Sequence, residues 1–489
     1  MRDKKIMIAL LCMLVFVSNI ATYHFTSKHF SGQDSALLEE LLPGEEEVQA
    51  ERDNSYPEEL ELFLKVYQSL ISRYIEKVPP EQLLKGAIQG MVGSLGDPQT
   101  YFLDEEELEN IHIKISGSFS GIGIEVSVVN DRITVIAPIK GSPGEKVGLV
   151  SGDQILAVDG ESLEGVSLVE AISRIRGPEN TQVNLTIKRE GFSEFFEFEV
   201  KRENIVLDTV SSKILEGDIG YIQVTNFDEH TGYNFKYELE KLEDEDIQGL
   251  ILDLRNNPGG VLQGAVELGE LLVPQGPITF MVNSEGEVIR SYYSSARAKE
   301  YEIVVLVNAY SASASEIIAG ALQDTDAAVL VGVNTYGKST VQTIENFYGE
   351  DVGLRLTVAK YLTPEHRDIH SVGLEPDIYV ELPEIFNYYR FPFTRELSFG
   401  NYGDDVKIFQ KMLEGLGYNF EMEGYFDEKT VENLKVFQKA NNLGPSGILE
   451  STTLRVLYEK VEKELAGLDT QLNTAIEYIQ GLAETVPEP

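Results

Sequence analysis

Apolar positions divide the chain into a helical start, a strand-rich middle and a helical end. Over residues 57–91 they recur at helical spacing in two segments, and a Gly-Asp-Pro turn follows the second segment. Short strands and one helix are predicted over 116–202, and strands alternate with helices over 203–390. Helical spacing returns over 397–460, where it supports a small three-helix core. The pattern therefore predicts a multidomain protein of mixed α/β and α+β class.

The most informative stretch is residues 303–342. An apolar run over 303–307 predicts a buried strand, and small residues that include Ser313 lead into a helical pattern. A second apolar run over 327–331 leads into a Gly-Lys-Ser turn. A strand that delivers a serine to a helix N-terminus exposes the hydroxyl and places free backbone N–H groups beside it, where they can stabilise an oxyanion. This stretch is therefore a candidate for a catalytic nucleophile.

Three hypotheses compete for these residues. Ser313-x-x-Glu316 before an apolar run is a capping box, which would make Ser313 a helix cap and nothing more. Residues 332–339 fit the nucleotide-binding pattern G-x-x-x-x-G-K-[ST], but the β-branched residues that follow oppose the helix that a P-loop needs. The third hypothesis is a Ser–Lys hydrolase in which Lys338 is the general base. Local pattern alone leaves all three open.

Lys338 can act as a general base only if its amine is neutral, which requires burial and no close carboxylate partner. Its neighbours Tyr336, Gly337 and Val341, together with nearby apolar strand residues, permit burial. Gln342, four residues further on, could hold the amine in place without charging it. None of the six histidines lies in a G-x-S-x-G context, so a Ser-His-Asp site has no evident base.

The segments SASASEIIAGALQD and TYGKSTVQ together resemble the carboxy-terminal processing proteases, which are serine peptidases with a Ser–Lys–Gln site. The resemblance covers both the spacing and the flanking residues. It implies that Ser313 is the nucleophile, that Lys338 is the base, and that Gln342 orients the base.

A glycine-rich turn upstream, in the segment LDLRNNPGG, follows a predicted buried strand and precedes a helix. The family resemblance implies that one glycine N–H of this turn joins the N–H of Ala314 to form the oxyanion hole. We assign this role to Gly259, with Gly260 as the alternative. No cofactor or metal is expected, and Cys12, the single cysteine, excludes a cysteine-based metal site.

Residues 113–202 combine a glycine-rich loop with short strands and one helix. With the segment GSPGEKVGLVSGDQILAVDG, they resemble PDZ domains of bacterial proteases. Backbone N–H groups of four loop residues can cradle a carboxylate, and the strand after them accepts a peptide as an added strand. Arg176 follows the predicted helix, and the resemblance implies that it couples the module to the active site. The four carboxylate-binding residues are Gly121, Ile122, Gly123 and Ile124.

Residues 391–462 form a separate unit that resembles the peptidoglycan-binding modules of cell-wall enzymes. Ser446-Gly447 stands where many members have a DG pair, and the chain has no tryptophan to stack on sugar. The resemblance implies peptidoglycan as a further partner. An apolar pattern over 461–482 predicts a last helix that is a candidate for contact with another subunit, and we assign residues 463–489 to this helix and the tail.

The N-terminus carries targeting signals. Residues 1–25 combine basic residues with an apolar run, which is typical of a signal peptide or signal anchor. We expect a retained anchor, because residues 19–21 form a poor cleavage site. An acidic linker over 26–56 and a helical arm over 57–112 follow, and the family resemblance makes the arm a dimerisation element.

The charge of the chain argues against anionic partners. The chain has 40 basic and 81 acidic residues, a net charge of −41, which argues against nucleic acid and against anionic membrane surfaces.

These observations lead us to expect a bacterial extracytoplasmic serine endopeptidase, anchored in the membrane or secreted at the cell wall, and homodimeric. Its protease core would span 203–390. It would dock substrate C-termini on the PDZ domain and be gated by that binding. The alternatives are a catalytically silent PDZ and cell-wall scaffold, and a cell-wall hydrolase. The hydrolase lacks an evident paired-carboxylate or zinc signature.

Overall fold

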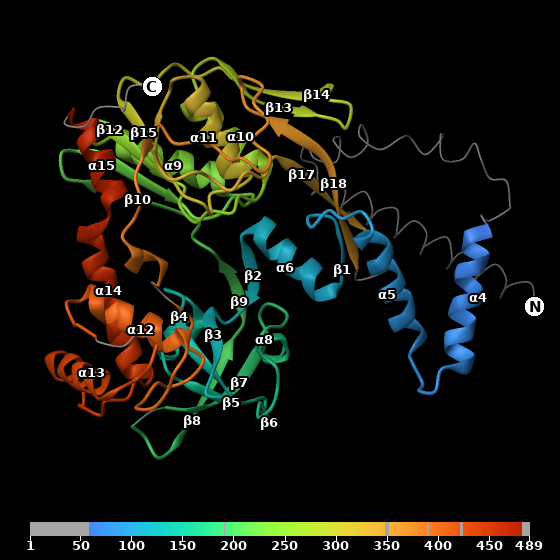
Figure 1. The fold of residues 1–489 in the computed structure, drawn as a ribbon, viewed down its shortest axis with the longest axis vertical. Coiled ribbons are helices and arrows are strands. Elements are labelled where there is room, and N and C mark those ends of the chain that lie inside the picture. Colours follow the sequence, from blue (N-terminus) through green and yellow to red (C-terminus); the bar gives the residue numbers. More distant parts are fainter. Residues whose placement is uncertain (1–57, 190, 348–351, 389–390, 421–423, 482–489) are drawn as a thin grey trace, which may run out of the picture. The chain divides into compact units, whose positions relative to one another are not determined.

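A computed structural model, drawn as a ribbon in Figure 1, divides the chain into two compact units, residues 1–88 and 89–489. The predicted signal anchor at 1–25 and the acidic linker at 26–56 lie outside the described residues. None of the helices in the described ranges has the length and apolar character that spanning a bilayer requires. The structure describes residues 58–189, 191–347, 352–388, 391–420 and 424–481.

The first unit contributes α4 (Glu58–Arg73) and most of α5 (Pro80–Gly93), which are the two helices that the apolar spacing predicts. Large apolar side chains of α4 are exposed: Leu62, Phe63, Leu64, Val66, Leu70 and Ile71. This helix therefore presents an apolar surface of the kind that packs on a partner.

The second unit continues from α5 through β1 (Tyr101–Leu103) into α6 (Glu105–Ser116). The Asp104 side chain accepts the Glu107 N–H at 3.1 Å, and the Glu107 carboxylate accepts the Asp104 N–H at 3.0 Å. This capping box begins α6, and Gly117, with φ 64°, ends it. The α6 helix leads directly into the PDZ domain.

The predicted PDZ domain has a sheet of order β3-β4-β5-β7-β8, with β3 at its edge, and the short β6 (Glu161–Ser162) pairs with β5. Its fully buried core includes Val135, Leu185 and Ile187. An edge strand has free backbone groups, so β3 can accept an added peptide strand. The main elements are β3 (Ile124–Val129), β4 (Arg132–Pro138), β5 (Gln154–Val158), α8 (Leu168–Ile175), β7 (Gln182–Lys188) and β8 (Phe195–Lys201).

The region predicted as the protease core is built on a sheet of order β10-β11-β12-β15-β16-β19, in which all neighbours except β10 and β11 run parallel. Its central strands are apolar on both faces, as parallel strands covered on both sides require. Helices α9, α10 and α11 pack on one face. The elements are β10 (Val210–Leu215), β11 (Ile219–Val224), α9 (Thr231–Glu243), β12 (Gly249–Asp253), α10 (Leu262–Leu272), β15 (Glu302–Val307), α11 (Ala314–Asp324), β16 (Val329–Gly332) and β19 (Ile378–Tyr379).

A second sheet has the order β1-β18-β13-β14, and β17 also pairs with β18. The long β18 therefore contacts both β17, which carries Gln342, and β1, which precedes α6. This arrangement brings the segment before the PDZ domain next to a candidate catalytic residue. The new strands are β13 (Gly276–Val282), β14 (Val288–Ser294), β17 (Thr340–Asn346) and β18 (Gly353–Leu362).

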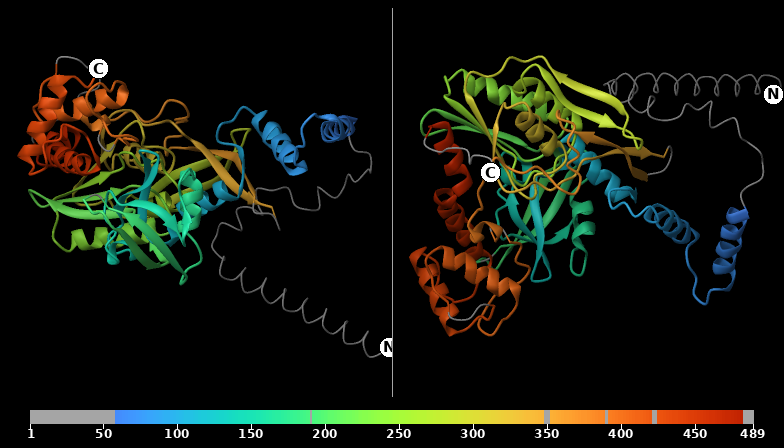
Figure 2. Two further views of the ribbon diagram at one scale, coloured as in Figure 1. Left: turned by 90° about the horizontal axis from the view of Figure 1, so that it is seen from below. Right: turned by 45° about the horizontal axis from the view of Figure 1, so that its top comes forward.

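The C-terminal module contains the predicted three helices around buried aromatic side chains such as Phe409, Phe426 and Phe437. Its last helix, α14, is followed by α15, and both are red in Figure 2. α15 packs on the face of the main sheet opposite α10 and α11, where Ala475 is fully buried. This face of the predicted last helix is used within the chain, not for contact with another subunit. The helices are α12 (Asp404–Gly415), α13 (Glu428–Ala440), α14 (Ser451–Leu468) and α15 (Thr470–Ile479).

Candidate active site

Ser313 lies in the turn between β15 and α11. Its backbone has φ 56° and ψ −115°, a strained conformation for a residue with a side chain. The Ser313 carbonyl accepts hydrogen bonds from the N–H groups of Glu316 and Ile317, at 2.9 and 3.0 Å. The predicted strand, serine turn and helix are therefore present in that order, and Ser313 immediately precedes the first helical residue, Ala314.

The Glu316 carboxylate joins the Ser313 turn to the segment that contains Lys338. Glu316 is fully buried, and one of its oxygens accepts both the Ser313 N–H and the Lys338 N–H, each at 2.9 Å. The other oxygen accepts the Gly337 N–H at 2.7 Å and the Thr335 hydroxyl at 2.5 Å. The capping interaction that the sequence predicts thus also holds the second candidate residue near the first.

Tyr361 provides a second link between the same two segments. Its hydroxyl lies 3.0 Å from the Ser313 carbonyl oxygen and 2.7 Å from the Lys338 carbonyl oxygen, and its side chain is buried. Ser313 and Lys338 are 25 positions apart in the sequence. The buried side chains of Glu316 on α11 and Tyr361 on β18 bring their backbones together.

The Lys338 side chain is half-buried, and burial lowers its pKa to about 8. The Arg355 guanidinium also contributes to this lowering of the pKa, whereas the carboxylates of Glu316 and Asp97 oppose it. Within the described part of the chain, no hydrogen bond or ion pair engages the Lys338 amine. Its environment therefore gives a larger share of the neutral form that a general base requires than an ordinary lysine has.

Gln342 lies on β17 and bonds to groups other than Lys338. Its amide nitrogen donates to the Thr340 hydroxyl at 2.9 Å and to the Thr357 hydroxyl at 3.2 Å. Its amide oxygen accepts from Arg355 Nη2 at 3.2 Å. Gln342 is only four positions from Lys338 in the sequence. In this conformation, however, its side chain is bonded to residues of β17 and β18.

The glycine turn after β12 packs closely on the Ser313 turn. A Cβ atom on Gly259 would lie 2.7 Å from both the Ala312 carbonyl oxygen and the Ser313 Cβ, so only glycine fits there. However, the Gly259 N–H donates to the Asn257 side-chain oxygen at 2.9 Å. It is therefore not free to bind an oxyanion in this conformation, which differs from the assignment made from the sequence.

Gly260 is the alternative donor. The backbone bridge to Phe227 uses the Gly259 carbonyl and the Val261 N–H, and leaves the Gly260 N–H unused. Among the described residues, neither the Gly260 N–H nor the Ala314 N–H has a hydrogen-bond partner. These two groups are therefore available to a ligand.

Asn257 holds the glycine turn against the nucleophile turn. It is fully buried, and its backbone carbonyl accepts the Ala312 N–H and the Ser315 hydroxyl, both at 3.0 Å. Its side chain bonds to the Gly259 N–H and to the Val224 carbonyl. One residue thus fixes the relative position of both candidate oxyanion donors.

The nucleotide-binding hypothesis is wrong for residues 332–339. A P-loop opens into a helix whose N-terminus holds phosphate, whereas Ser339 is followed by strand β17. The Gly337 backbone has φ 82°, and a Cβ there would approach Gly373 N to 2.7 Å, so this glycine serves a tight turn.

The predicted carboxylate loop lies just before the edge strand β3. Gly123 has φ 69°, and a Cβ there would come within 2.3 Å of the Ser142 side chain. The Ile122 carbonyl accepts the Gly144 N–H at 2.8 Å, and the Gly123 carbonyl accepts the Ser142 hydroxyl at 2.8 Å. The carbonyls of the loop are therefore held inward, as a loop that presents N–H groups to a carboxylate requires.

Arg176 follows the last residue of α8 and reaches out of the PDZ domain. Its guanidinium lies 3.7 Å from the Glu109 carboxylate on α6 and 5.1 Å from the ring centre of Phe119. The structure therefore places Arg176 against the segment that joins the PDZ domain to β1.

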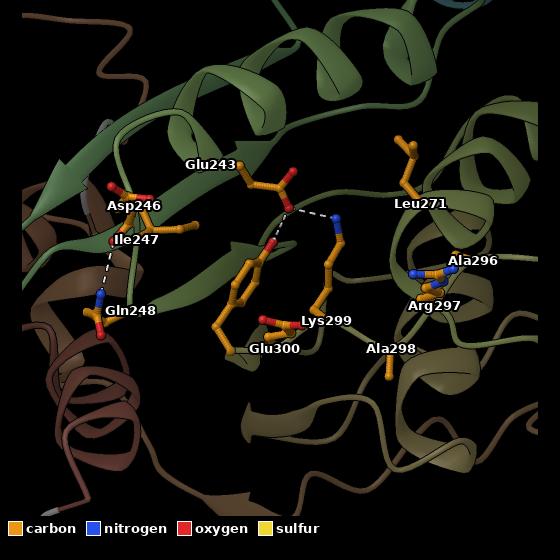
Figure 3. A pocket seen from close by; sticks show the side chains of 11 residues that line it. Glu243, Asp246, Ile247, Gln248, Leu271, Ala296, Arg297, Ala298, Lys299 and Glu300 are labelled. Atoms are coloured by element: carbon orange, nitrogen blue, oxygen red, sulfur yellow. Dashed lines mark hydrogen bonds and ion pairs between the residues drawn. The ribbon is translucent and has the colours of Figure 1, made fainter.

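A separate open pocket of about 640 Å³ is lined by none of the candidate catalytic or peptide-binding residues (Figure 3). Within it the Glu243 carboxylate accepts Lys299 Nζ and the Tyr301 hydroxyl, both at 2.6 Å. Tyr301 immediately precedes β15, so the pocket lies at the amino end of that strand. Ser313 and the glycine turn follow the carboxyl ends of β15 and β12, where open parallel sheets bind ligands.

The sequence reasoning missed four residues around Lys338. Glu316 was visible only as half of a capping box, and Asp97 only as part of a Gly-Asp-Pro turn. Arg355 and Tyr361 had no local signal, because they reach the site from β18, a strand more than fifteen positions away along the chain.

Comparison with known proteins places this geometry in a family. Peptidase family S41 matches residues 218–380, and a PDZ domain matches 134–189. A putative peptidoglycan binding domain matches 402–457, and the N-terminal domain of the activating protease CtpB matches 15–107. The carboxy-terminal processing protease CtpA of Bacillus subtilis (strain 168) is 37% identical over 422 residues, which cover 85% of this chain and 89% of that protein. The chain belongs to the carboxy-terminal processing proteases.

A second bacterial relative agrees, and one solved structure is reported beside it as similar. CtpB of the same organism is 35% identical to this protease over 442 residues, 89% of this chain and 91% of that protein. The solved photosystem II D1 C-terminal processing protease is 27% identical, with a TM-score of 0.41, and the match covers 68% of this chain and 95% of that one. This carboxy-terminal processing protease is thus a serine-type peptidase with a PDZ domain, and its mixed α/β multidomain fold matches the prediction. The silent-scaffold and cell-wall-hydrolase alternatives do not apply.

Proposed function

We propose that this protease cleaves proteins with a Ser–Lys–Gln site, in which Ser313 is the nucleophile, Lys338 the general base and Gln342 the residue that orients the base. The observation that carries the proposal is the Glu316 carboxylate, which accepts the N–H groups of both Ser313 and Lys338 on one oxygen. The lysine held in this way is half-buried and has a lowered pKa, and none of the described carboxylates is bonded to its amine.

The chemistry follows from these positions. The neutral Lys338 amine takes the hydroxyl proton as the Ser313 oxygen attacks the scissile carbonyl carbon. The resulting ammonium returns the proton to the leaving amine, and water then hydrolyses the acyl-enzyme. The oxyanion forms beside the free N–H of Ala314, and we propose the Gly260 N–H as its second donor, because the Gly259 N–H is bonded to Asn257.

This mechanism predicts a rate that rises with pH. With a pKa of about 8, about a tenth of Lys338 is neutral at pH 7, whereas an ordinary lysine would be neutral in well under a thousandth of molecules. Because the neutral form is the active one, kcat/KM for a peptide substrate should increase about tenfold from pH 7 to a plateau above pH 9. A profile with its midpoint near 6.5, the range of histidine, would contradict a lysine base.

Substrate selection is proposed to begin at the PDZ domain. The Gly121–Ile124 loop and the open edge of β3 suit a peptide with a free C-terminal carboxylate, which the loop N–H groups bind while the peptide adds to the sheet. Binding there is proposed to gate cleavage, with Arg176 as the contact between the PDZ domain and α6.

A pair of peptides tests this proposal. A peptide with a free apolar C-terminus should be cleaved at least about tenfold faster than its C-terminally amidated form, because amidation removes the charge that the loop binds. Arg176→Ala should lower cleavage without lowering peptide affinity in calorimetry. Equal cleavage of the free and amidated peptides would refute gating and leave the Ser–Lys chemistry standing.

Attachment and assembly are further parts of the proposal. The bacterial relatives and the peptidoglycan-binding match support a site of action at the cell wall, outside the cytoplasm. We propose that residues 1–25 anchor the chain in the membrane and that the exposed apolar side of α4 pairs with a second copy. Membrane fractionation, sedimentation velocity and co-sedimentation with purified cell walls test the anchor, the homodimer and glycan binding in turn.

A further inference from the structure

Gln342 is held in place by both ends of its amide. Arg355 Nη2 occupies the oxygen, and the Thr340 and Thr357 hydroxyls accept from the nitrogen. Among the described residues no hydrogen bond joins Gln342 to the Lys338 amine, and these three bonds hold the amide in its present position. The oxygen has a second lone pair that could accept the amine once the two side chains come closer. The amide oxygen is the natural acceptor for an amine N–H, and it is the atom that Arg355 occupies.

Arg355 has a fixed position because β18 lies between two strands. It is paired with Ile344 of β17 on one side and with Tyr101 of β1 on the other. Its guanidinium reaches both ways: Nη2 lies 3.2 Å from the Gln342 oxygen, and Nη1 lies 3.1 Å from the Tyr101 hydroxyl. A planar fork can serve two partners at once, which a lysine ammonium at the same position does less well.

A second chain of hydrogen bonds leads to the same segment. The Gln342 amide nitrogen donates to the Thr357 hydroxyl, and that hydroxyl donates to Asp97 at 2.6 Å. Asp97 also accepts the Thr100 hydroxyl at 2.7 Å. Burial, which alone would raise the pKa of Asp97, is outweighed by these hydroxyl bonds, so its pKa is lowered and it stays ionised at neutral pH. Arg355 and Thr357, which bond to the two ends of the Gln342 amide, are therefore both bonded to residues 97–101.

That segment leads straight to the PDZ domain. β1 is followed by α6, and Glu109 on α6 is the ion-pair partner of Arg176. A shift of α6 that displaces β1 along β18 would move the Tyr101 hydroxyl and the Asp97 carboxylate together. Arg355 would then lose the Tyr101 hydroxyl and Thr357 would lose the Asp97 carboxylate, so both β18 residues that bond to the Gln342 amide would lose their partners in this segment.

We propose that Arg355 is a positioning residue that holds Gln342 away from Lys338 in the unloaded enzyme, and that displacement of the 97–101 segment releases it. This inference rests on the proposed Ser–Lys–Gln site and adds the residues that regulate it. The charged groups that face the Lys338 amine are Arg355 on β18, Glu316 on α11 and Asp97 in the turn before β1. Arg355 is the cation among them, so it adds to the effect of burial in lowering the pH at which the base becomes neutral.

The test compares Arg355→Gln with wild type by kcat/KM against pH, for the free and the amidated peptide. Loss of the cation should move the midpoint of the pH profile upward by about half a unit or more, because the ammonium form of Lys338 is no longer opposed by a like charge. Release of Gln342 should reduce the preference for the free peptide about fivefold or more. If either quantity is unchanged, including the case of a uniformly lower rate, Arg355 is only structural and the inference fails.

Four variants make the result decisive. Arg355→Lys keeps the charge but loses the fork, so the midpoint should stay near the wild-type value while the preference falls; this variant also decides the question if Arg355→Gln does not fold. Tyr101→Phe removes one hydroxyl and should lower the preference alone. Arg290→Gln, on β14 of the same sheet, is the matched control and should change neither. Lys338→Ala in the same assay separates failure of the Arg355 inference from failure of the proposed site. A fully active Lys338→Ala enzyme would refute the Ser–Lys–Gln site itself.

Discussion

Lys338→Ala is expected to reduce kcat/KM for a tailed peptide by about 10³-fold or more and to leave peptide affinity unchanged. The nucleophile and the base of such a site act as a unit, so removal of either removes most of the chemical acceleration. Peptide binding is retained because the proposed PDZ loop lies in a separate domain with its own buried core. Cleavage is measured by mass spectrometry of the products, and affinity by calorimetry with the free peptide.

Three comparison variants support the interpretation. Ser313→Ala should give a loss of similar size, whereas Lys236→Ala, an exposed lysine paired with Glu240 on α9, should keep full activity. Gln342→Ala should cost less than either catalytic substitution, because an orienting residue does not itself react. Undiminished cleavage by Lys338→Ala would exclude this lysine as the base.

Glu316→Gln is expected to lower kcat/KM by about 10²-fold and to destabilise the fold by about 1–3 kcal/mol. The carboxylate accepts four hydrogen bonds in a fully buried position, from Ser313, Lys338, Gly337 and Thr335. An amide of the same shape presents two N–H groups to these donors, so at least some donors lose their acceptor. The Ser313 turn and the Lys338 segment would then separate, and small displacements at a reacting centre are costly.

A matched substitution separates misplacement from general instability. Glu238→Gln removes a half-buried carboxylate of the same domain that bonds to Ser212 and Lys241, away from the site. It should lower the melting temperature slightly and keep kcat/KM. Full activity in Glu316→Gln would mean that the carboxylate does not position the two residues, and the observation on which the proposed site rests would lose its force.

The amino-acid sequence by itself determined the class of fold and the identity of the main candidate residues. Apolar spacing predicted the helices of the arm and of the C-terminal module, because a buried helix face repeats every few residues wherever it packs. Ser313 and Lys338 could be singled out because each lies at a turn next to a buried strand, a local arrangement that the neighbouring residues encode. The family followed from two short segments whose spacing was matched together.

The tertiary structure decided how these parts meet. Glu316 binds Lys338, and Arg355 binds Gln342, through contacts between strands and helices that no local pattern records. The Asn257 side chain accepts the Gly259 N–H, so among the described residues it is the Gly260 N–H that has no partner. The last helix covers a sheet face, where its apolar pattern alone fitted a subunit contact equally well. Periodicity reports which side of an element is buried, but the burying partner and the direction of each hydrogen bond depend on segments that only the folded chain brings together.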